Sequence, residues 1–186
     1  MKIQVDNNIQ IELLVPKHAQ SLFELTEQNR QHLKQWLAWL DLVKTYEDTE
    51  IFIETAVHQH NHNQGSSFAV LYCGELVGVA GFNHYDFQHK WGAIGYWLSA
   101  SCAGKGIMTK VVNALLAYGF YENRLNKIEI RCGQQNFKSR AIPERLGFTN
   151  EATLRQCEWL YDHYIDHVVY SLLASEYQAN KPHHHS

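Results

Sequence analysis

Residues 101–110 read SCAGKGIMTK and join two stretches with different hydrophobic periods. The preceding residues 91–98 (WGAIGYWL) are typical of a strand, whereas residues 107–121 place apolar side chains on one face of a helix. Gly104 and Gly106 allow the backbone to approach a ligand closely. Because the first N–H groups of a helix are unpaired and lie at the positive end of its dipole, this segment predicts a phosphate cradle. The alternative is a glycine-rich turn that holds no ligand.

Two common nucleotide-binding motifs do not fit this segment. A Walker loop requires G-x-x-x-x-G-K-[ST], but Lys105 is followed by Gly106, and Ser99 stands at the early glycine position. A Rossmann fingerprint requires a glycine where Thr109 stands, inside a parallel βαβ unit. The remaining prediction is a phosphate compound held by backbone N–H groups at a strand–helix junction.

The composition narrows the class of protein. The 186 residues suit one domain with a core of its own, and the net charge of −3 argues against nonspecific nucleic-acid binding. No apolar run approaches the roughly 18 residues of a membrane span, and no signal peptide is recognisable. The four cysteines lack a CxxC pair, which favours a reducing, cytoplasmic setting. They are Cys73, Cys102, Cys132 and Cys157.

Hydrophobic patterns along the chain predict a strand, two helices, three strands, a helix, a strand, a helix and two final strands. Short connections between the three consecutive strands indicate an antiparallel meander. We therefore expect a single mixed α/β domain at 9–177 and a polar tail at 178–186. Its twisted, mostly antiparallel sheet has about seven strands and about four flanking helices. The strands are expected at 9–13, 66–73, 74–82, 91–98, 127–132, 152–159 and 163–172, and the helices at 22–37, 48–62, 107–121 and 136–146.

Four stretches together resemble the GNAT acyltransferase superfamily, and in particular its RimJ/RimL-type branch. They are IGYWL at 94–98, GKGIMT at 104–109, the pair Asn136 and Ser139, and PERLGF at 143–148. The resemblance extends from about Ile9 to Tyr177 and implies a GNAT fold whose central sheet is splayed at a bulge. It also implies direct acetyl transfer from acetyl-coenzyme A (acetyl-CoA) to an amine. Members of this branch acetylate protein N-termini, notably those of ribosomal proteins.

The resemblance implies a binding site for acetyl-CoA. Amides of the glycine loop hold the pyrophosphate, and the preceding strand, with Gly95 as a reasonable bulge position, lies along the pantetheine. Asn136 is expected to hydrogen-bond the pantetheine, although it would also serve as a plain N-cap. The implied cofactor-binding residues are Tyr96, Trp97, Leu98, Gly104, Lys105, Gly106, Ile107, Met108, Thr109, Asn136 and Ser139.

Three positions depart from the family pattern. Ala103 replaces a Gln or Arg at the start of the loop, which removes a polar contact. Met108 replaces a small residue but keeps its backbone N–H. Pro143 stands where many superfamily members carry a tyrosine general acid, so another group must protonate the leaving thiolate, or none does.

Two side chains are implied in catalysis by the resemblance. Glu158 matches the position at which RimL-type enzymes use a carboxylate to deprotonate the amine through water, and its alternative is an exposed strand glutamate. Ser139 matches the position proposed to serve the thiolate, and its alternative is a capping or surface serine. Cys132 is expected near the thiol end of the cofactor as a buried structural thiol, because the family transfers acetyl directly.

The sequence says less about the binding site of the amine that accepts the acetyl group. By resemblance, the segment between the first two helices covers the active site, so Trp36, Trp39 and Tyr46 are expected to line the acceptor entry, with plain packing as the alternative. The histidines have no cysteine or acidic group spaced to complete a site, and no metal is expected. They are His58, His60, His62, His163 and His167.

The sequence thus predicts an acetyl-CoA-dependent N-acetyltransferase that acts on the N-terminal α-amine of a protein or peptide. If the protein is an enzyme, the alternative acceptor is a small amine, such as an antibiotic, an amino acid or a polyamine. If it is not an enzyme, the alternative is a regulatory protein that binds coenzyme A without catalysis, since Pro143 and Ala103 depart from the family pattern. No nucleic-acid or membrane partner is expected, and the chain is expected to be a monomer or a homodimer.

Overall fold

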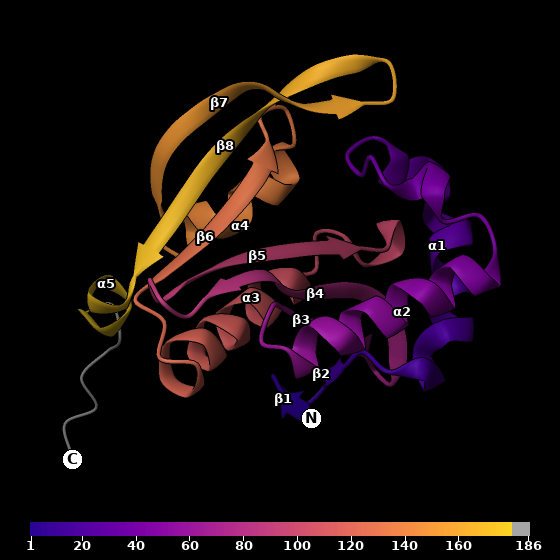
Figure 1. Cartoon of the computed structure of the whole chain (residues 1–186), viewed down its shortest axis with the longest axis horizontal. Helices are drawn as coiled ribbons and strands as arrows, with labels where there is room; N and C mark the ends of the chain where they lie inside the picture. Colours follow the sequence, from indigo (N-terminus) through magenta and orange to yellow (C-terminus); the bar gives the residue numbers. More distant parts are fainter. Residues whose placement is uncertain (180–186) are drawn as a thin grey trace.

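The computed structural model describes residues 1–179, in which one sheet carries helices on its two faces (Figure 1). The strands are β1 (Lys2–Gln4), β2 (Ile9–Leu13), β3 (Ser66–Tyr72), β4 (Glu75–Asp86), β5 (Trp91–Leu98), β6 (Lys127–Gly133), β7 (Thr149–Leu160) and β8 (His163–Leu173). The helices are α1 (Ala19–Lys34), α2 (Tyr46–Asn61), α3 (Ile107–Ala117), α4 (Phe137–Arg145) and α5 (Ala174–Ala179). Short 3₁₀ segments at Pro16–His18, Leu40–Leu42 and Ala100–Cys102 lie between them.

The eight strands lie in the order β1-β2-β3-β4-β5-β6-β8-β7. All neighbouring pairs are antiparallel except β5 and β6, which are parallel and are joined through α3. The predicted mixed α/β fold and mostly antiparallel sheet are confirmed. The additional strand is β1, which a turn at Asp6 brings back against β2, since the Asp6 carboxylate accepts hydrogen bonds from the N–H groups of Asn8 and Ile9.

Local signals in the sequence set the helix boundaries. Thr45 and Asp48 form a reciprocal capping box that starts α2, each side chain accepting from the other's backbone N–H. The Asn136 side chain caps α4, and Gly147 follows that helix with a φ of +78°. The expected helix at 107–121 is α3 followed by a π-helical turn at Tyr118–Glu122.

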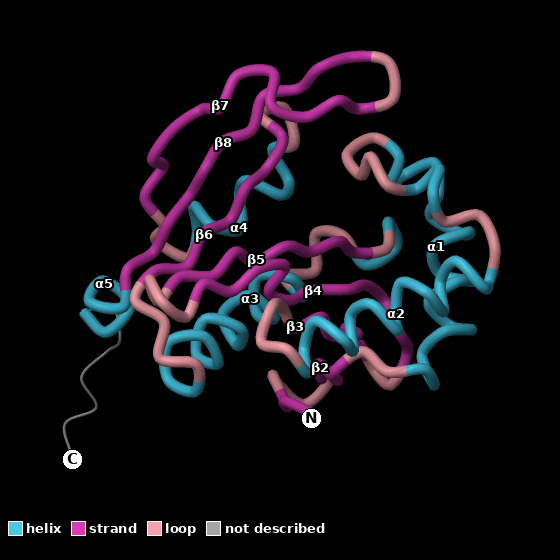
Figure 2. Tube along the Cα trace, viewed as in Figure 1, coloured by secondary structure: helices cyan, strands magenta, loops and turns pink. Residues whose placement is uncertain are grey.

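Alternating side chains of the strands build two cores, one on each face of the sheet. Phe68 and Val70 of β3 pack with α3 on one face, where Val111 and Leu115 are fully buried. Ala69, between them, packs with α1 and α2 on the other face. Figure 2 shows α1 and α2 together, away from α3 and α4. The two cores fix the sheet between helix layers, so its strand ends can form a site.

The sheet opens between β5 and β6. Their parallel pairing stops at Ile94 and Ile130, and beyond this point the two strands diverge (Figure 1). The expected bulge position at Gly95 is wrong: the extra residue is Asn83 on the neighbouring strand β4, while Gly95 pairs regularly with Gly81. Gly95 instead accommodates the bulge, because a Cβ there would lie 2.2 Å from the Asn83 side-chain nitrogen.

The end of the described chain is helical. Gln178 and Ala179, which we expected to begin a polar tail, belong to α5, and the rest of the expected tail at 180–186 lies outside the described residues. Within residues 1–179, none of the helices has the length and apolar character needed to cross a membrane.

Candidate active site

A cavity of about 450 Å³ lies where β5 and β6 diverge. Its wall is built from β3 to β8, from α2 and α4, and from the segment that follows α1. The cavity therefore gathers residues that are more than 120 positions apart in the sequence. The expected site residues on its wall are Trp36, Trp39, Tyr96, Trp97, Asn136, Ser139 and Glu158.

The strand edges at the opening offer backbone groups to a ligand. From Gly95 to Leu98, β5 stays paired with β4 but no longer pairs with β6. Its second edge therefore presents N–H and C=O groups to the cavity, as an unpaired edge strand does. An extended ligand with amide groups can pair with such an edge, so this geometry fits a pantetheine chain.

The glycine loop precedes α3 with its N–H groups available. Gly104 and Gly106 have φ values of +78° and +74°, and a Cβ at either position would meet no heavy atom within 4 Å. Glycine is thus required here for backbone conformation. Within residues 1–179, the N–H groups of residues 104–109 have no protein acceptor, while the Lys105 ammonium lies 5.7 Å from the centre of the Tyr72 ring. These N–H groups fit a phosphate.

Ser139 lies in a small polar cluster on the cavity wall. Its N–H donates to the Asn136 side-chain oxygen at 3.2 Å, its carbonyl accepts from the Tyr96 hydroxyl at 2.9 Å, and its Oγ lies 3.3 Å from the Cys132 sulfur. Burial raises the pKa values of both Tyr96 and Cys132, so both stay protonated near neutral pH. Ser139 Oγ is therefore the hydroxyl of this cluster that can exchange hydrogen bonds with a ligand.

Glu158 reaches the cavity because β7 is irregular just before it. The pairing of β7 with β8 shifts between Leu154 and Glu158, and Gln156 within the shift has a φ of +49°. The Asp166 carboxylate on β8 accepts from the Gln156 N–H at 2.7 Å and so fixes this bulge. Glu158 then lies 2.7 Å, Oε2 to Nε2, from His167, which also lines the cavity. The site thus pairs a half-buried carboxylate with an imidazole.

The family model that describes the acetyltransferase (GNAT) domain matches residues 8–149 of this chain. This match covers well over half of the 186 residues. The chain belongs to the GNAT acetyltransferase family. It is therefore an N-acetyltransferase, and the predicted resemblance is confirmed.

Two relatives cover nearly the whole GNAT chain. YdaF of Bacillus subtilis, whose name assigns it provisionally to the ribosomal N-acetyltransferases, is 36% identical over 96% of this chain and 98% of its own. The ribosomal-protein-serine acetyltransferase of Escherichia coli is 31% identical over 91% of this chain and 94% of its own. Both similarities extend beyond the region that the family model matches, into β7 and β8.

Two solved structures share the fold. RimL, titled a ribosomal L7/L12 α-N-protein acetyltransferase in complex with coenzyme A, superposes with a TM-score of 0.92 at 27% identity and covers 95% of this chain and 99% of its own. The microcin C7 self-immunity acetyltransferase MccE, in complex with acetyl-CoA and AMP, has a TM-score of 0.87 at 31% identity. This match covers 92% of this chain and 95% of the MccE chain. The fold of this GNAT enzyme is thus that of RimL.

Aromatic side chains cover the cavity on the side of α1 and α2. Trp36 and Trp39 lie on its wall, and the Trp39 ring is nearly parallel to that of Phe52, with an interplanar angle of 6° and 6.4 Å between ring centres. Tyr46 does not lie on the wall: it packs edge-on against Phe23 and belongs to the core under α1 and α2. The structure therefore brings two of the three expected acceptor residues to the cavity.

The tip of the β7–β8 hairpin contacts the segment that follows α1. The Tyr161 hydroxyl donates to the Leu37 carbonyl, and the Lys34 ammonium lies 4.5 Å from the centre of the Tyr161 ring. Figure 2 shows the hairpin tip facing this loop across the open end of the sheet. Because Leu37 and the hairpin both contribute to the cavity wall, this contact holds two remote parts of the site together.

The histidines that we examined for metal binding have other contacts. The His58 and His62 rings stack 4.0 Å apart, and His60 Nδ1 lies 2.9 Å from the Ser66 hydroxyl. His163 pairs with Asp162. Within the described part of the chain, no three His, Cys, Asp or Glu side chains gather in a way that could hold a metal ion.

Sequence reasoning missed His167 and Asn83 as site residues. His167 was considered only as a metal ligand, although a hairpin turn at Tyr161 places it two residues beyond the partner of Glu158, Ile165. Such diagonal neighbours on paired strands lie within reach of long side chains, so locating the turn would have revealed the pair. Asn83 had no comparable signal, because a bulge depends on the register of two strands.

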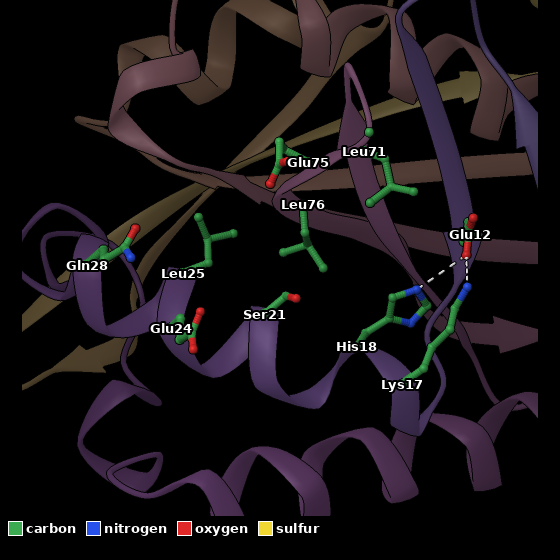
Figure 3. A pocket seen from close by; sticks show the side chains of 11 residues that line it. Glu12, Lys17, His18, Ser21, Glu24, Leu25, Gln28, Leu71, Glu75 and Leu76 are labelled. Atoms are coloured by element: carbon green, nitrogen blue, oxygen red, sulfur yellow. Dashed lines mark hydrogen bonds and ion pairs between the residues drawn. The ribbon is translucent and has the colours of Figure 1, made fainter.

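A second cavity of about 450 Å³ lies between α1, β2 and the β3–β4 turn (Figure 3). Glu12, almost fully buried, lies 2.6 Å from the Lys2 ammonium, 2.5 Å from that of Lys17 and 3.4 Å from His18 Nε2. Hydrogen bonds from Lys17 and Lys2 lower the pKa of Glu12 to about 2. Burial lowers the pKa of His18, so its ring is neutral near pH 7. The charge of Glu12 is thus already paired within the protein.

Proposed function

We propose that this GNAT enzyme transfers the acetyl group of acetyl-CoA to the α-amino group at the N-terminus of a protein, with a ribosomal protein as the favoured acceptor. One observation carries the proposal: the carboxylate of Glu158 lies on the same cavity wall as Ser139 and the open edge of β5. The names of the Escherichia coli relative and of RimL support the choice of acceptor. A cytoplasmic setting fits, since all four cysteines are free.

Acetyl-CoA would be held mainly by backbone groups of this chain. The N–H groups of residues 104–109 suit its pyrophosphate, and the free edge of β5 at residues 95–98 suits the amides of its pantetheine. Of the two solved neighbours described above, RimL is in complex with coenzyme A and MccE with acetyl-CoA. When bound, acetyl-CoA supplies an activated thioester carbonyl. All further steps depend on how this chain positions the amine and moves its proton.

Two side chains would handle the protons. Glu158 accepts a proton from the acceptor amine, directly or through one water, so that the amine attacks as a neutral nucleophile. Ser139 Oγ donates a hydrogen bond to the sulfur as it leaves and replaces the tyrosine that Pro143 excludes from α4. The Tyr96 hydroxyl fixes the Ser139 backbone by a hydrogen bond to its carbonyl, and Cys132 stays a neutral thiol.

A small amine attached to a planar ring is the second candidate acceptor. Trp39 and Phe52 present nearly parallel ring faces on the acceptor side, and aromatic faces bind flat rings by stacking. The solved neighbour MccE, which is 31% identical, contains AMP beside acetyl-CoA. This candidate shares the catalytic residues with the first and differs only in what the aromatic wall recognises.

The proposal is tested by an acetyl-CoA turnover assay over a mixed panel of acceptors. The panel contains N-terminal peptides of ribosomal proteins, ring-bearing amines and polyamines. We expect a ribosomal N-terminal peptide to give the highest kcat/KM, and Glu158→Gln to lower it roughly 10²–10⁴-fold without changing the affinity for coenzyme A. Glu54→Gln, an exposed glutamate on α2, is the control and should behave as the parent.

Two outcomes contradict the proposal in different ways. Preference for a ring-bearing amine overturns the assigned acceptor but keeps the catalytic residues. Unchanged turnover of Glu158→Gln, on an acceptor that the parent acetylates well, overturns the role of Glu158 whatever the acceptor is.

A further inference from the structure

We propose that His167 is a positioning residue for acetyl transfer: it holds the Glu158 carboxylate in one orientation through a hydrogen bond to a single oxygen. This inference rests on the proposed role of Glu158. It begins from the 2.7 Å contact between His167 Nε2 and Glu158 Oε2 on the cavity wall. His167 lies outside the four stretches of sequence that carry the resemblance to the family.

The short contact determines where the protons lie. An ionised carboxylate only accepts hydrogen bonds, so His167 Nε2 carries a hydrogen and donates a hydrogen bond to Oε2 of Glu158. The second oxygen, Oε1, has no hydrogen-bond partner within residues 1–179, and neither has Nδ1 of His167. The pair therefore commits one oxygen of Glu158 to the imidazole and leaves the other for the amine or its water. A contact to an ionised group at this distance is among the stronger hydrogen bonds.

The strands around the pair fix both partners. Asp166 and His167 are neighbours on β8 whose side chains point to opposite faces, as successive strand residues do. Asp166 binds the Gln156 N–H of the β7 bulge, and His167 binds Glu158 just after that bulge. Two adjacent residues of β8 thus hold the bulge and the carboxylate that follows it. A pair present only for stability would not need a positive φ at Gln156 to bring it to the cavity.

The test compares His167→Gln with His167→Ala. The amide nitrogen of glutamine can replace Nε2 as donor but takes up no proton. At pH 8 we expect His167→Ala to lower kcat roughly 10- to 50-fold with KM for acetyl-CoA unchanged, and His167→Gln to stay within about fivefold of the parent.

A double variant separates this inference from the proposed function. If His167 acts through Glu158, adding His167→Ala to Glu158→Gln should cost little further activity. His163→Ala, an exposed histidine on the same strand, controls for the substitution and should match the parent. Thermal unfolding of each variant checks folding.

Three results would overturn the inference. They are full activity of His167→Ala, a glutamine variant as poor as the alanine variant, or additive losses in the double variant. If Glu158→Gln itself is fully active, the proposed function fails instead.

Discussion

Two cavities of about 450 Å³ each lie in this domain, and each has a glutamate beside a histidine, but the two glutamates differ in how completely they are paired. The cavity between α1 and the β3–β4 turn surrounds a buried carboxylate, Glu12, that is saturated by Lys2, Lys17 and His18. At the cavity between β5 and β6, the part of the chain that the structure describes leaves a free strand edge and a carboxylate with one free oxygen, and the N–H groups at the start of α3 have no acceptor within the same residues.

The difference separates a structural site from a functional one. Volume does not distinguish the two cavities, and both contain a glutamate and a histidine. In the first, the ion pairs of Glu12 join β1, β2 and the turn before α1, so they stabilise the fold. In the second, the pairing of β5 with β6 ends at Ile94 and Ile130, so the backbone groups of β5 beyond this point remain available for ligands.

The largest effect is expected at the start of α3. Gly106→Pro removes an N–H and requires a φ near −65° where the structure has +74°, so affinity for coenzyme A should fall roughly 100-fold or more. Calorimetric titration measures this affinity, and circular dichroism shows whether the variant is folded. A folded variant with parental affinity would show that the loop amides do not hold the cofactor.

A substitution in the cavity around Glu12 should change the stability of the fold and not the activity. Glu12→Gln removes the charge that Lys17 and Lys2 stabilise, and we expect a loss of about 1–2 kcal/mol in the free energy of unfolding at pH 7, since both lysines are more than half exposed. The pKa of Glu12 is lowered to about 2 from 4.5, so its contribution is present above about pH 4.5 and is lost as the pH falls toward 2.

The measurement for Glu12 is denaturant unfolding of parent and variant between pH 7 and pH 3. The gap in unfolding free energy should narrow over the acid part of this range. A gap that is constant with pH, or a variant with reduced kcat/KM at full stability, would contradict the structural role of this cavity.

A smaller effect is expected at Ser139. Ser139→Ala removes the hydroxyl proposed to assist the leaving sulfur and should lower kcat about tenfold while KM for the acceptor stays the same. The effect should appear in single-turnover kinetics even if product release limits steady-state turnover. An unchanged single-turnover rate would assign thiolate protonation to solvent.

The smallest effect is expected for the lysine of the glycine loop. Lys105→Ala removes an exposed charge that lies near the Tyr72 ring, so affinity for coenzyme A should fall only about two- to fivefold, and less at high salt. Calorimetry at two salt concentrations measures this. A loss as large as that of Gly106→Pro would assign phosphate binding to the side chain instead of the backbone.

The sequence was most informative where chemistry is local. The glycine loop, the α4 cap at Asn136 and the alternation of β6 predicted elements that the structure confirms. The position of the bulge was wrong, because the register between β4 and β5 depends on contacts along two strands. Tyr46 lies away from the cavity for a similar reason: the capping box at Thr45 starts α2 there, and the ring joins the core.

The candidate site was predicted only in part, because its geometry depends on strand pairing. Glu158 and Ser139 were identified by resemblance, and the structure brings both to one cavity. His167 was missed as their neighbour, since its place beside Glu158 follows from the β7 bulge and the hairpin turn. A bulge of this kind follows no hydrophobic period that sequence analysis could detect.

The most direct test of the account compares Glu158→Gln and Glu12→Gln in one set of conditions. For each variant, kcat/KM with the best acceptor and the free energy of unfolding are measured at pH 7. We predict that Glu158→Gln loses kcat/KM by roughly 10²–10⁴-fold at nearly parental stability, while Glu12→Gln loses stability at parental kcat/KM. The opposite assignment, or a loss of both properties in both variants, would contradict the separation of the two cavities.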